Sequence, residues 1–462
     1  MNSLFGFETE YGIAVEGASA HDLISHSREV VKSFAQTGRA FAAPWNYKSE
    51  DPRADQRGFR AHALSVDPVD AQFDRPGERA ASPEADRCDH VLENGARFYN
   101  DHGHPEYATP ECADLRSLVA HDKAGELVAL ECAQIYAAKI GKSVQIFKNN
   151  TDFHGASYGS HESYLLRRGV SWDDVTRNLA PFLATRIVFC GAGKVGCEEK
   201  GVEVPFQISQ RADFFQTLQS VDTLHNRPLV NTRDEPHADA NKFRRLHVIS
   251  GDANMSQWAI ALRAGTTNLV AALVESGWSF PLELRDPVRA IKTLSRDQNF
   301  SWKIENTDAI SVQRLYLDAA AKLDLPGSEW ILAEWDEALR DLEADFWRLS
   351  DRADWVAKRA LLEGFVEAEN LDWTRDRETL QSLDLAYCNV DEAESLYGAL
   401  VENGQMRELV SREEIEAAQT TPPENSRAKA RGEFVKSRAS EVARISWGAV
   451  ELKNGQRLAF EI

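Results

Sequence analysis

Polar and apolar residues alternate near the beginning of the chain, where residues 4–13 read LFGFETEYGI. A period of two indicates a β-strand, in which successive side chains point to opposite faces. One face of this strand would carry Phe5, Phe7, Thr9, Tyr11 and Ile13. The other face would carry Glu8 and Glu10. We therefore predict that two carboxylates share one face of a sheet.

A second alternating pattern surrounds Asn94-Gly95 in the segment VLENGARFYND. Asn-Gly between two such runs favours a tight hairpin turn. On the second strand of this hairpin, Arg97, Tyr99 and Asp101 point to the same face. The pattern thus predicts a strand that carries an acidic residue near its end.

The spacing of apolar positions predicts most of the remaining elements. Helices are expected from Leu23 to a stop at Gly38, over residues 115–140, directly after a Gly-rich loop at 155–163, and through most of residues 255–389. Strands are expected at residues 143–148, 186–190, 204–209 and 245–250. The predicted core positions of the long helical region are Trp258, Leu262, Leu269, Leu273, Leu315, Leu317, Trp330, Ile331, Trp335 and Trp347.

Residues 44–90 lack sustained periodicity and are rich in Pro, Asp, Arg and Ala. This composition predicts a long mobile loop, and loops of such length inside a compact domain are usually functional or disordered. From about residue 390 the apolar content falls, and two short strands are expected around Asn454-Gly455. We therefore predict a large domain over residues 1–389 and a small C-terminal domain over residues 390–462.

Acidic residues outnumber basic ones in this 462-residue chain, with 73 Asp and Glu against 53 Lys and Arg and a formal net charge of −20. Nucleic-acid phosphates are bound by basic residues, so this balance argues against a nucleic-acid partner. No stretch approaches the roughly 20 apolar residues of a membrane helix, and the start lacks the pattern of a signal peptide. Six cysteines are scattered without metal-site spacing, which indicates reduced thiols. We expect a cytoplasmic protein.

Candidate chemistry collects on the two predicted strands and in the DHGHPE segment after the second one. Glu8, Glu10, Tyr99, Asp101 and Glu106 offer oxygen ligands of the kind that Mg²⁺ shares with nucleotide phosphates. Neighbouring carboxylates repel one another unless a positive charge offsets them. The alternative for Glu8 and Glu10 is that they face solvent on a half-exposed sheet.

Residues 231–252 form a second candidate cluster, in which charges of both signs alternate before an apolar strand. Arg233, His237, Arg244 and Arg245 are candidates to bind phosphate or the carboxylates of an acidic partner. The alternative is a salt-bridged surface loop.

Histidines supply a third set of candidates. His161 lies at the predicted junction between the Gly-rich loop and a helix, where it is a candidate metal or phosphate ligand. The alternative is a capping or core histidine. His102 and His104 are expected to form supporting hydrogen bonds rather than to bind metal.

The GAGKVG sequence at residues 191–196 matches the glycine pattern of a dinucleotide site. The sequence that follows, CEEKGVEVP, has no helical stretch to present its N-terminus to a pyrophosphate. A glycine turn between strands is therefore the better interpretation.

Several segments together resemble one known family. They are GFETEYGI, NGARFYNDHGHPEYATPEC, KNNTDFHGASYGSHESYL, FQISQRADFF and NTRDEPHADANKFRRLHVISGDANM. These segments span most of residues 4–260 and resemble the family of Pup ligases and depupylases, which act on the small disordered protein modifier Pup. The stretch WNYKSEDPRADQRGF resembles a loop that the depupylase branch carries and the ligases lack. The close spacing in DHGHPE favours the same branch.

The resemblance implies an α+β, glutamine-synthetase-like fold with a curved antiparallel sheet, packed with helices, that binds Mg²⁺ and ATP, or ADP with phosphate. It also implies a small C-terminal domain beside this catalytic domain. The implied reactions are hydrolysis of the isopeptide bond between the C-terminal Glu of Pup and a substrate lysine, and deamidation of a C-terminal Gln of Pup. The implied partners are Pup and pupylated proteins, and indirectly the bacterial proteasome system. The alternatives are a Pup–protein ligase, a non-catalytic Pup- or nucleotide-binding relative, and a carboxylate–amine ligase for small molecules.

The resemblance also assigns roles to residues at matching positions. Asp101 corresponds to the catalytic aspartate, which either attacks the side-chain carbonyl or orients a water molecule. The implied metal ligands are Glu8, Glu10, Tyr99, Glu106, His161 and His237. The implied nucleotide contacts are Arg97, Thr109, Arg233 and Trp447. Because Pup is acidic, we also expect a local basic groove, with Arg211, Arg244 and Arg245 as candidates.

Overall fold

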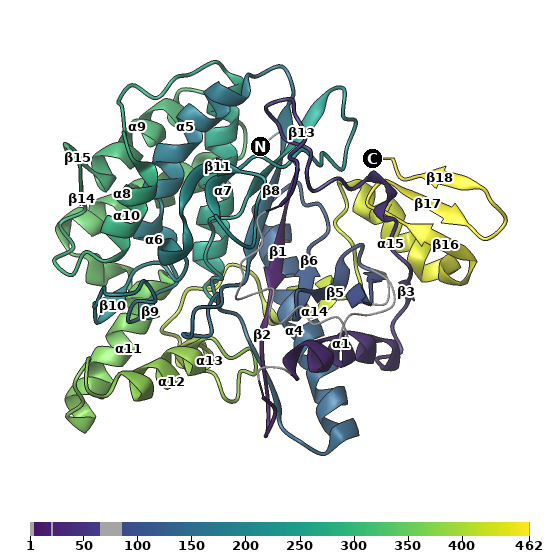
Figure 1. Ribbon diagram of the computed structural model, residues 1–462, viewed down its shortest axis with the longest axis horizontal. Helices are drawn as coiled ribbons and strands as arrows, with labels where there is room; N and C mark the ends of the chain where they lie inside the picture. Colours follow the sequence, from purple (N-terminus) through teal and green to yellow (C-terminus); the bar gives the residue numbers. More distant parts are fainter. Residues whose placement is uncertain (1–3, 20–21, 65–85, 462) are drawn as a thin grey trace.

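Seven antiparallel strands form the central sheet, in the order β13-β8-β1-β6-β5-β4-β3. The computed structural model describes residues 4–19, 22–64 and 86–461. The strands are β1 (Phe5–Glu10), β3 (Phe41–Ala42), β4 (His90–Leu92), β5 (Arg97–Asp101), β6 (His104–Ala108), β8 (Ser160–Arg167) and β13 (Phe243–Val248). Figure 1 shows the sheet between a large group of helices in teal and green and the C-terminal elements in yellow. This arrangement confirms the predicted α+β class.

Strand β1 lies between β8 and β6 in the middle of the sheet. Its register pairs Glu10 with Glu106 of β6 and Glu8 with His161 of β8. Phe5 and the other apolar residues of the strand are buried on the face that packs against helices. The alternation predicted from the sequence is therefore confirmed, and it places both carboxylates on the opposite face.

The predicted strand over residues 4–13 is divided at Tyr11. The backbone N–H of this residue donates to Pro105 O (2.9 Å), and its side chain is completely buried. The chain then continues as β2 (Gly12–Val15), which pairs with β7 (Val144–Phe147) in a separate sheet. Alternation alone does not reveal this break, because both strands keep the same period.

The hairpin between β4 and β5 turns at the predicted position. Gly95 has a φ of 82°, and the side-chain Oδ1 of Asn94 accepts a hydrogen bond from Ala96 N (3.0 Å). Glycine is favoured here because it adopts this left-handed conformation without a steric penalty.

Three helices, α1 (Leu23–Lys32), α4 (Leu115–Ile140) and α7 (Gln257–Glu275), pack against the sheet. The predicted helix over residues 115–140 is confirmed, with Asp114 capping its first turn and Gly141 ending it at a φ of 67°. α1 ends before the predicted stop, and a short 3₁₀ turn follows over Ser33–Gln36. Within α4, a Cβ on Gly125 would lie 2.4 Å from the ring of Tyr107, so a glycine is required for this close approach.

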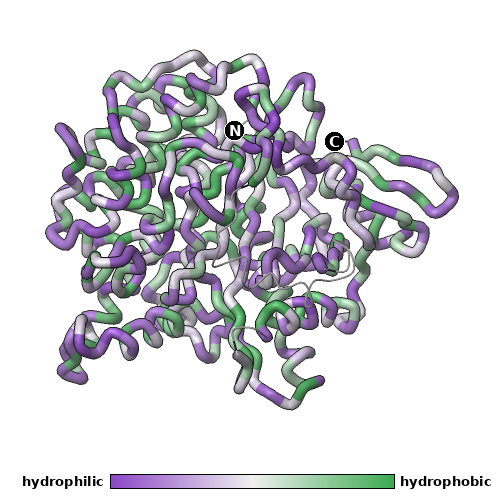
Figure 2. Tube along the Cα trace, viewed as in Figure 1, coloured by the Kyte–Doolittle hydropathy of each residue, from purple (hydrophilic) through white to green (hydrophobic). Residues whose placement is uncertain are grey.

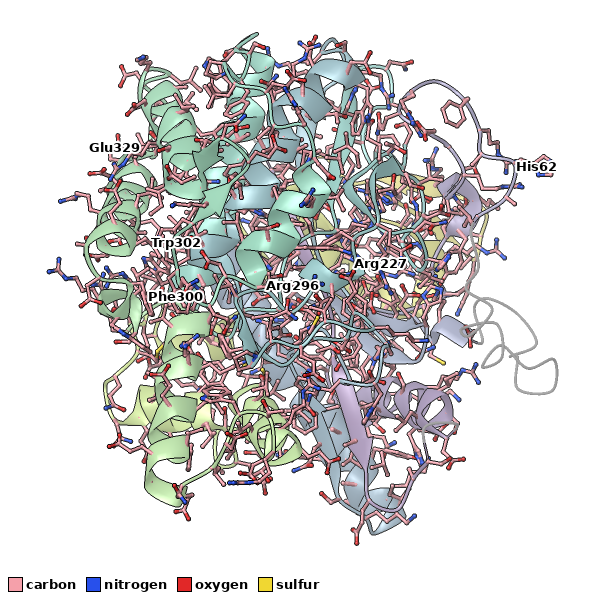
Figure 3. The ribbon with its side chains drawn as sticks, turned by 60° about the vertical axis from the view of Figure 1, so that its left-hand side comes forward. His62, Arg227, Arg296, Phe300, Trp302 and Glu329 are labelled. Carbon is pink, nitrogen blue, oxygen red and sulfur yellow. The ribbon has the colours of Figure 1, made fainter. Side chains whose placement is uncertain are left out.

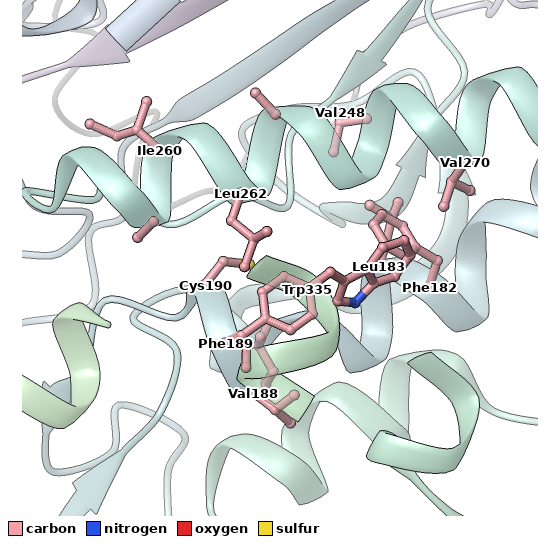
Figure 4. Packing of buried hydrophobic residues seen from close by; sticks show 14 of the residues in the cluster. Phe182, Leu183, Val188, Phe189, Cys190, Val248, Ile260, Leu262, Val270 and Trp335 are labelled. Carbon is pink, nitrogen blue, oxygen red and sulfur yellow. The ribbon is translucent and has the colours of Figure 1, made fainter. Parts of the chain in front are cut away.

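The remaining helices build the large core beside the sheet. They are α5 (Trp172–Thr185), α6 (Ile187–Cys190), α8 (Pro287–Ser295), α9 (Ala309–Ala321), α10 (Glu329–Ala344), α11 (Asp354–Glu369) and α12 (Arg377–Tyr387). Figure 4 shows Trp335 between Phe182 and Phe189, with ring centroids 6.1 and 6.3 Å away. Truncating such a buried aromatic residue to alanine typically costs about 3–5 kcal/mol of stability. Trp330, predicted to be in the core, is instead 37% exposed.

Hydrophobic positions concentrate along the strands and in the helical interior, whereas the outer loops are mainly hydrophilic (Figure 2). Within the described residues, no helix is long and apolar enough to cross a membrane. Each of the six cysteines lies in the described residues as a thiol rather than as half of a disulfide.

Two predicted segments adopt a different secondary structure. Residues 186–190, predicted as a strand, continue α5 as the single turn α6. Their β-branched residues favour a strand locally, but all of α6 is buried against the helical core, and this packing overrides the local preference. The Gly-rich segment 155–163 leads into β8, so the predicted loop-to-helix junction is also wrong.

The glycine motif at residues 191–196 contains a short strand. β9 (Lys194–Val195) pairs with β10 (Phe206–Gln207), and Gly193 and Gly196 have φ values of 73° and 79°. A dinucleotide site needs a helix at this point, so the structure agrees with the rejection of that motif.

Part of the predicted loop over residues 44–90 is packed onto the protein. Asn46 N donates to Ile445 O (2.8 Å), and Gln56 N donates to Thr232 O (2.8 Å). The segment extends to the exposed His62, which points away from the body of the protein in Figure 3. The expectation of a mobile loop is therefore wrong for the described residues up to 64, and residues 65–85 lie outside the described part of the chain.

The C-terminal elements pack in more than one place, since the first two lie against α12 and α4 and the later ones lie beside β3 and β4. They are α13 (Leu396–Glu402), α14 (Arg412–Ala418), α15 (Arg427–Arg438), β16 (Val442–Ile445), β17 (Ala449–Leu452) and β18 (Arg457–Ala459). The expected pair of strands around Asn454-Gly455 corresponds to β17 and β18. A cluster formed by Trp45, Val91, Val435 and Ile445 joins these elements to the sheet. The boundary at residue 390 stays a prediction, because α14 packs against α4 of the larger part.

Candidate active site

Three carboxylates meet on the polar face of three neighbouring strands. Glu10 of β1, Asp101 of β5 and Glu106 of β6 each place an oxygen atom within 4.8 Å of the others. The antiparallel register brings them together, since Glu10 lies opposite Glu106 and Glu106 lies opposite Tyr99. The Tyr99 hydroxyl donates to Glu106 Oε1 (2.5 Å). We call these four residues the acidic cluster.

The charges of the acidic cluster are only partly balanced by the surrounding protein. Burial, followed by the repulsion of Asp101, Glu10 and Glu8, raises the pKa of Glu106 well above its ordinary value. Burial also raises the pKa of Asp101, but Arg87 and His102 outweigh it and hold this pKa well below its ordinary value. A hard cation prefers such carboxylate oxygens, and it would relieve the repulsion between them. The acidic cluster therefore has the chemistry of a Mg²⁺ site.

A second group of possible ligands surrounds Glu8 on the other side of β1. His161 Nδ1 and His247 Nε2 each lie 3.5 Å from Glu8 Oε2, and Arg245 Nη1 lies 3.1 Å from Glu8 Oε1. Burial, together with Arg245, lowers the pKa of His247 to about 3. A neutral imidazole of this kind is able to bind a metal ion. We call Glu8, His161 and His247 the histidine cluster.

The predicted ligand His237 lies close to this second cluster. Burial and then Arg245 lower the pKa of His237 well below its ordinary value, and Glu8 partly opposes this effect. The backbone of His237 has a φ of 49°, which is uncommon for a residue other than glycine. The structure thus places His237 beside the histidine cluster as a neutral side chain.

The two clusters are separated by very little space at Gly159. A Cβ atom at this position would lie 2.3 Å from His161 Nε2 and 2.8 Å from Glu10 Oε1. The backbone of Gly159 also accepts a hydrogen bond from Glu10 N (3.0 Å). Gly159 therefore helps to fix the distance between Glu10 of the acidic cluster and His161 of the histidine cluster.

Buried arginines line the same region. Arg211 is 1% exposed, and its Nε and Nη1 have no hydrogen-bond partner among the described residues. Burial and the neighbouring Arg227 lower the pKa of Arg211 to about 10. Burial likewise lowers the pKa of Arg233, despite the nearby acids Glu235, Asp101 and Glu8. A buried guanidinium with unpaired donors is suited to bind an anion.

The proposed basic groove for Pup is not found at the surface. Arg211, Arg244 and Arg245 are all buried, and Arg245 is occupied by Glu8 and Glu235. Arg244 donates to Arg168 O (2.9 Å). Arg244 and Arg245 are consecutive in β13 and Arg211 lies in a separate segment, and the sequence does not show that the surrounding elements cover all three.

Two of the predicted nucleotide contacts, Arg97 and Trp447, lie beside Trp45. Arg97 donates to Asp89 Oδ1 (2.8 Å), and its guanidinium lies 4.2 Å from the ring centroid of Trp45. Trp45 in turn packs edge-on against Trp447, with ring centroids 5.2 Å apart. Thr109 Oγ1 accepts a hydrogen bond from Phe7 N (2.9 Å), which ties it to β1.

Two residues that contact the predicted site residues, Arg87 and His247, are not among the candidates that the sequence offers. Alternation along β13 is a signal for His247, because it places this residue on the same face as Arg245. Arg87 comes from the segment without periodicity, so no sequence pattern marks it. His104 was expected only to support the site, and its ring stacks on Tyr158 at 4.4 Å.

The fold and the site together define a class of enzyme in which carboxylates gather on the polar face of an antiparallel sheet. The chain belongs to the Pup-ligase protein family, whose model matches residues 3–451.

Curated relatives from both branches of this family match the chain. A depupylase from Acidothermus cellulolyticus is 40% identical over 467 residues, which cover 97% of this chain and 91% of that protein. A Pup deamidase/depupylase from Mycolicibacterium smegmatis is 39% identical, with the same coverage of both chains. A Pup–protein ligase from Actinosynnema mirum is 40% identical over 363 residues, which cover 74% of this chain and 79% of the ligase. Similarity to the depupylases therefore extends over more of the chain.

Solved structures of a Pup ligase share the fold. The complex between the prokaryotic ubiquitin-like protein Pup and its ligase PafA has a TM-score of 0.79 and 28% identity. It covers 99% of this chain and 89% of the ligase. PafA in complex with ADP has a TM-score of 0.73 and 30% identity, and covers 87% of this chain and 92% of the ligase.

Proposed function

We propose that this chain is a depupylase and Pup deamidase. It hydrolyses the isopeptide bond between the C-terminal Glu of Pup and a substrate lysine, and it converts a C-terminal Gln of Pup to Glu. The observation that carries this proposal is the ionised Asp101 at the edge of the acidic cluster, in a chain similar to depupylases over 97% of its length. Its partners are Pup and pupylated proteins, which places it in the cytoplasm and indirectly in the bacterial proteasome system.

Mg²⁺ and ATP, or ADP with phosphate, are the proposed cofactors. Glu10, Tyr99 and Glu106 would hold one cation, and Glu8, His161 and His237 would hold a second. Bound there, a divalent cation supplies positive charge that offsets the carboxylates and polarises a substrate carbonyl. This assignment is supported by the crowding of carboxylate oxygens in the acidic cluster.

The nucleotide would be bound by residues from both sides of the site. The proposed contacts are Arg97, Thr109, Arg233 and Trp447. Arg211 is a further candidate to contact a phosphate, since two of its nitrogen atoms are buried without a partner. The similarity to a ligase solved with ADP supports nucleotide binding in this fold.

Asp101 has two available routes to cleave the bond. In the first, its carboxylate attacks the side-chain carbonyl carbon of the terminal residue of Pup, the C–N bond breaks, and the lysine amine leaves after gaining a proton. Water then hydrolyses the acyl-aspartate. In the second, the carboxylate accepts a proton from a water molecule that attacks the same carbon. Both routes require Asp101 to be ionised, as the nearby Arg87 ensures.

A Pup–protein ligase is the second candidate function, because a ligase is also 40% identical to this chain. The two reactions differ in their use of ATP. A ligase consumes one ATP for each conjugate that it forms, whereas a depupylase releases Pup from a conjugate and needs the nucleotide only to be bound.

The substitution Asp101→Asn tests this function. It keeps the shape of the side chain but removes the charge, so we expect cleavage to fall by at least about 1000-fold while Mg²⁺-dependent ATP binding persists. The measurement is the release of Pup from a purified pupylated protein, with and without nucleotide. Asp318→Asn, on an exposed face of α9, is the matched control. Turnover of Asp101→Asn at the wild-type rate, or net formation of conjugates with stoichiometric ATP use, would contradict the proposal.

A further inference from the structure

One oxygen atom of Asp101 is contacted by two positively charged or chargeable groups. Arg87 Nη1 lies 2.5 Å from Asp101 Oδ1, and His102 Nδ1 lies 2.7 Å from the same atom. The Oδ1 atom itself is buried. Glu10 and Glu106 complete the surroundings of the carboxylate.

The backbone brings these two contacts from different directions. Asp101 is the last residue of β5, and the next two residues, His102 and Gly103, form the turn to β6 with φ values of 47° and 90°. Arg87 comes from the segment before β4 and reaches across to the end of β5. The position of Arg87 is therefore not a consequence of the β5–β6 hairpin itself.

Arg87 also lies near Tyr99, one of the proposed metal ligands. Its guanidinium lies 5.8 Å from the ring centroid of Tyr99, and Arg97 lies 3.9 Å from the same ring. The side chain of Arg87 is 29% exposed and that of Asp101 is 18% exposed. A charge pair with this limited exposure restricts rotation of the carboxylate more than a fully solvated pair does.

We propose that Arg87 is a positioning residue for the proposed hydrolysis, which holds Asp101 Oδ1 and thereby leaves Oδ2 to react. Rotation about the last torsion of an aspartate exchanges its two oxygens, because this torsion is broad and nearly two-fold. The two oxygens are chemically equivalent, so a guanidinium against one of them does not choose between the two orientations but fixes the plane of the carboxylate and the direction of the other oxygen. Fixing a reacting group in this way lowers the barrier, and a misplacement of about 1 Å costs about 100-fold in rate.

Two other roles for Arg87 lead to different kinetics. If Arg87 only stabilises the fold, its loss lowers the melting temperature and the amount of active enzyme without changing the chemical step of the molecules that remain folded. If the ion pair with Arg87 instead prevents Asp101 from reaching the substrate, replacing Arg87 raises kcat.

The test compares Arg87→Ala and Arg87→Lys with the wild-type protein, using a purified pupylated protein and saturating Mg²⁺ and ATP. We expect Arg87→Ala to lower kcat about 10- to 100-fold and to change KM by no more than about twofold. Arg87→Lys should recover part of this loss, because it keeps the charge but not the planar fork. Added guanidinium ion at low millimolar concentration should also partly rescue Arg87→Ala.

Arg177→Ala is the matched control, because Arg177 forms an exposed pair with Asp174 away from the site. The inference is overturned if Arg87→Ala keeps the wild-type kcat, shows a higher kcat, or loses activity only in proportion to the fraction unfolded with no response to guanidinium. Because the inference depends on the proposed function, the wild-type protein is assayed beside Asp101→Asn. Absence of Pup release by the wild type contradicts the function itself, whereas release by the wild type and Arg87→Ala at the same rate contradicts only the role of Arg87.

Discussion

Glu8 connects side chains from three strands of the sheet. Its two oxygens contact His161 of β8 and both Arg245 and His247 of β13. Burial raises the pKa of Glu8, but the two histidines and Arg245 outweigh it and hold this pKa well below its ordinary value. Glu8 is therefore ionised, and it offers the negative charge that a cation beside the neutral His247 requires.

The substitution Glu8→Gln removes that charge with little change in volume. We expect the Mg²⁺ concentration needed for half-maximal depupylation to rise about 10- to 100-fold, because one of the proposed charged ligands is lost. The measurement is activity against Mg²⁺ concentration at fixed ATP. Glu16→Gln, at an exposed position beyond the site, is the control. An unchanged Mg²⁺ dependence would remove Glu8 from the set of metal ligands.

At the scale of elements, the start of β8 determines how the two clusters are separated. Gly159 immediately precedes this strand and approaches His161 on one side and Glu10 on the other. Its backbone carbonyl is bonded to β1, so the loop cannot move away without breaking that contact. The separation between β8 and β1 is thus fixed at the point where both clusters meet.

Gly159→Ala would place a methyl group in this space. We expect a loss of about 1–3 kcal/mol of stability from the added atoms and a fall in depupylation of about 100-fold from the displaced ligands. Gly169→Ala is a matched control at the other end of β8, where a Cβ atom meets nothing within 4 Å. Thermal unfolding and Pup release are measured for both variants. If Gly159→Ala is as active as Gly169→Ala, the two clusters do not depend on this close approach.

At the scale of the whole molecule, Arg431 joins the C-terminal elements to the sheet. This buried residue of α15 donates to Gly95 O (2.9 Å), to Trp447 O (2.7 Å) and to Glu111 Oε2 (2.5 Å). Arg427 Nε also donates to Glu111 Oε1 (2.6 Å). Trp447 is therefore positioned from two sides, by Arg431 and by its contact with Trp45.

The stability of this junction is expected to depend on pH. Burial raises the pKa of Glu111, but Arg431 and Arg427 outweigh it and lower the pKa to about 2. Its folded pKa lies below the unfolded value of about 4.3, so the contribution is present above that value and is lost as pH falls toward 2. We expect Glu111→Gln to lose about 2–3 kcal/mol at pH 7 relative to the wild type, and the difference to shrink below about pH 4.

Urea unfolding at several pH values between 7 and 3 measures this difference. The exposed Glu283→Gln is the control, and its unfolding free energy should follow the wild type throughout. A difference between Glu111→Gln and the wild type that stays constant down to pH 3 would show that the Glu111 charge does not stabilise the junction.

Local sequence patterns predicted the parts of the site that lie within one strand or one turn. Glu8 and Glu10 share a face because alternation is a property of the strand itself, and Gly95 marks its own turn. The contacts of Asp101 with Arg87, and of Glu8 with His247, join positions that are distant along the chain or come from separate elements. Their pairing depends on the order of strands in the sheet, and the alternation of polar and apolar residues along one strand does not reveal that order.

Tertiary packing also explains the errors in secondary structure. Residues 186–190 are apolar enough for either a buried strand or a buried helix, and the neighbouring α5 and α7 decide the outcome. The segment before residue 64 has no periodicity of its own. It is ordered by backbone contacts with Thr232 and Ile445, which lie far away in the sequence.

The central position of β1 limits how this site can change during evolution. Glu8 and Glu10 are two residues apart, so their Cα atoms are separated by about 7 Å of extended backbone. Single substitutions in β1 alter one cluster at a time. Insertion or deletion of one residue would instead turn both carboxylates toward the helices and bring apolar side chains to the reacting face. We therefore expect homologous sequences to vary in β1 by replacement and never by a change in length.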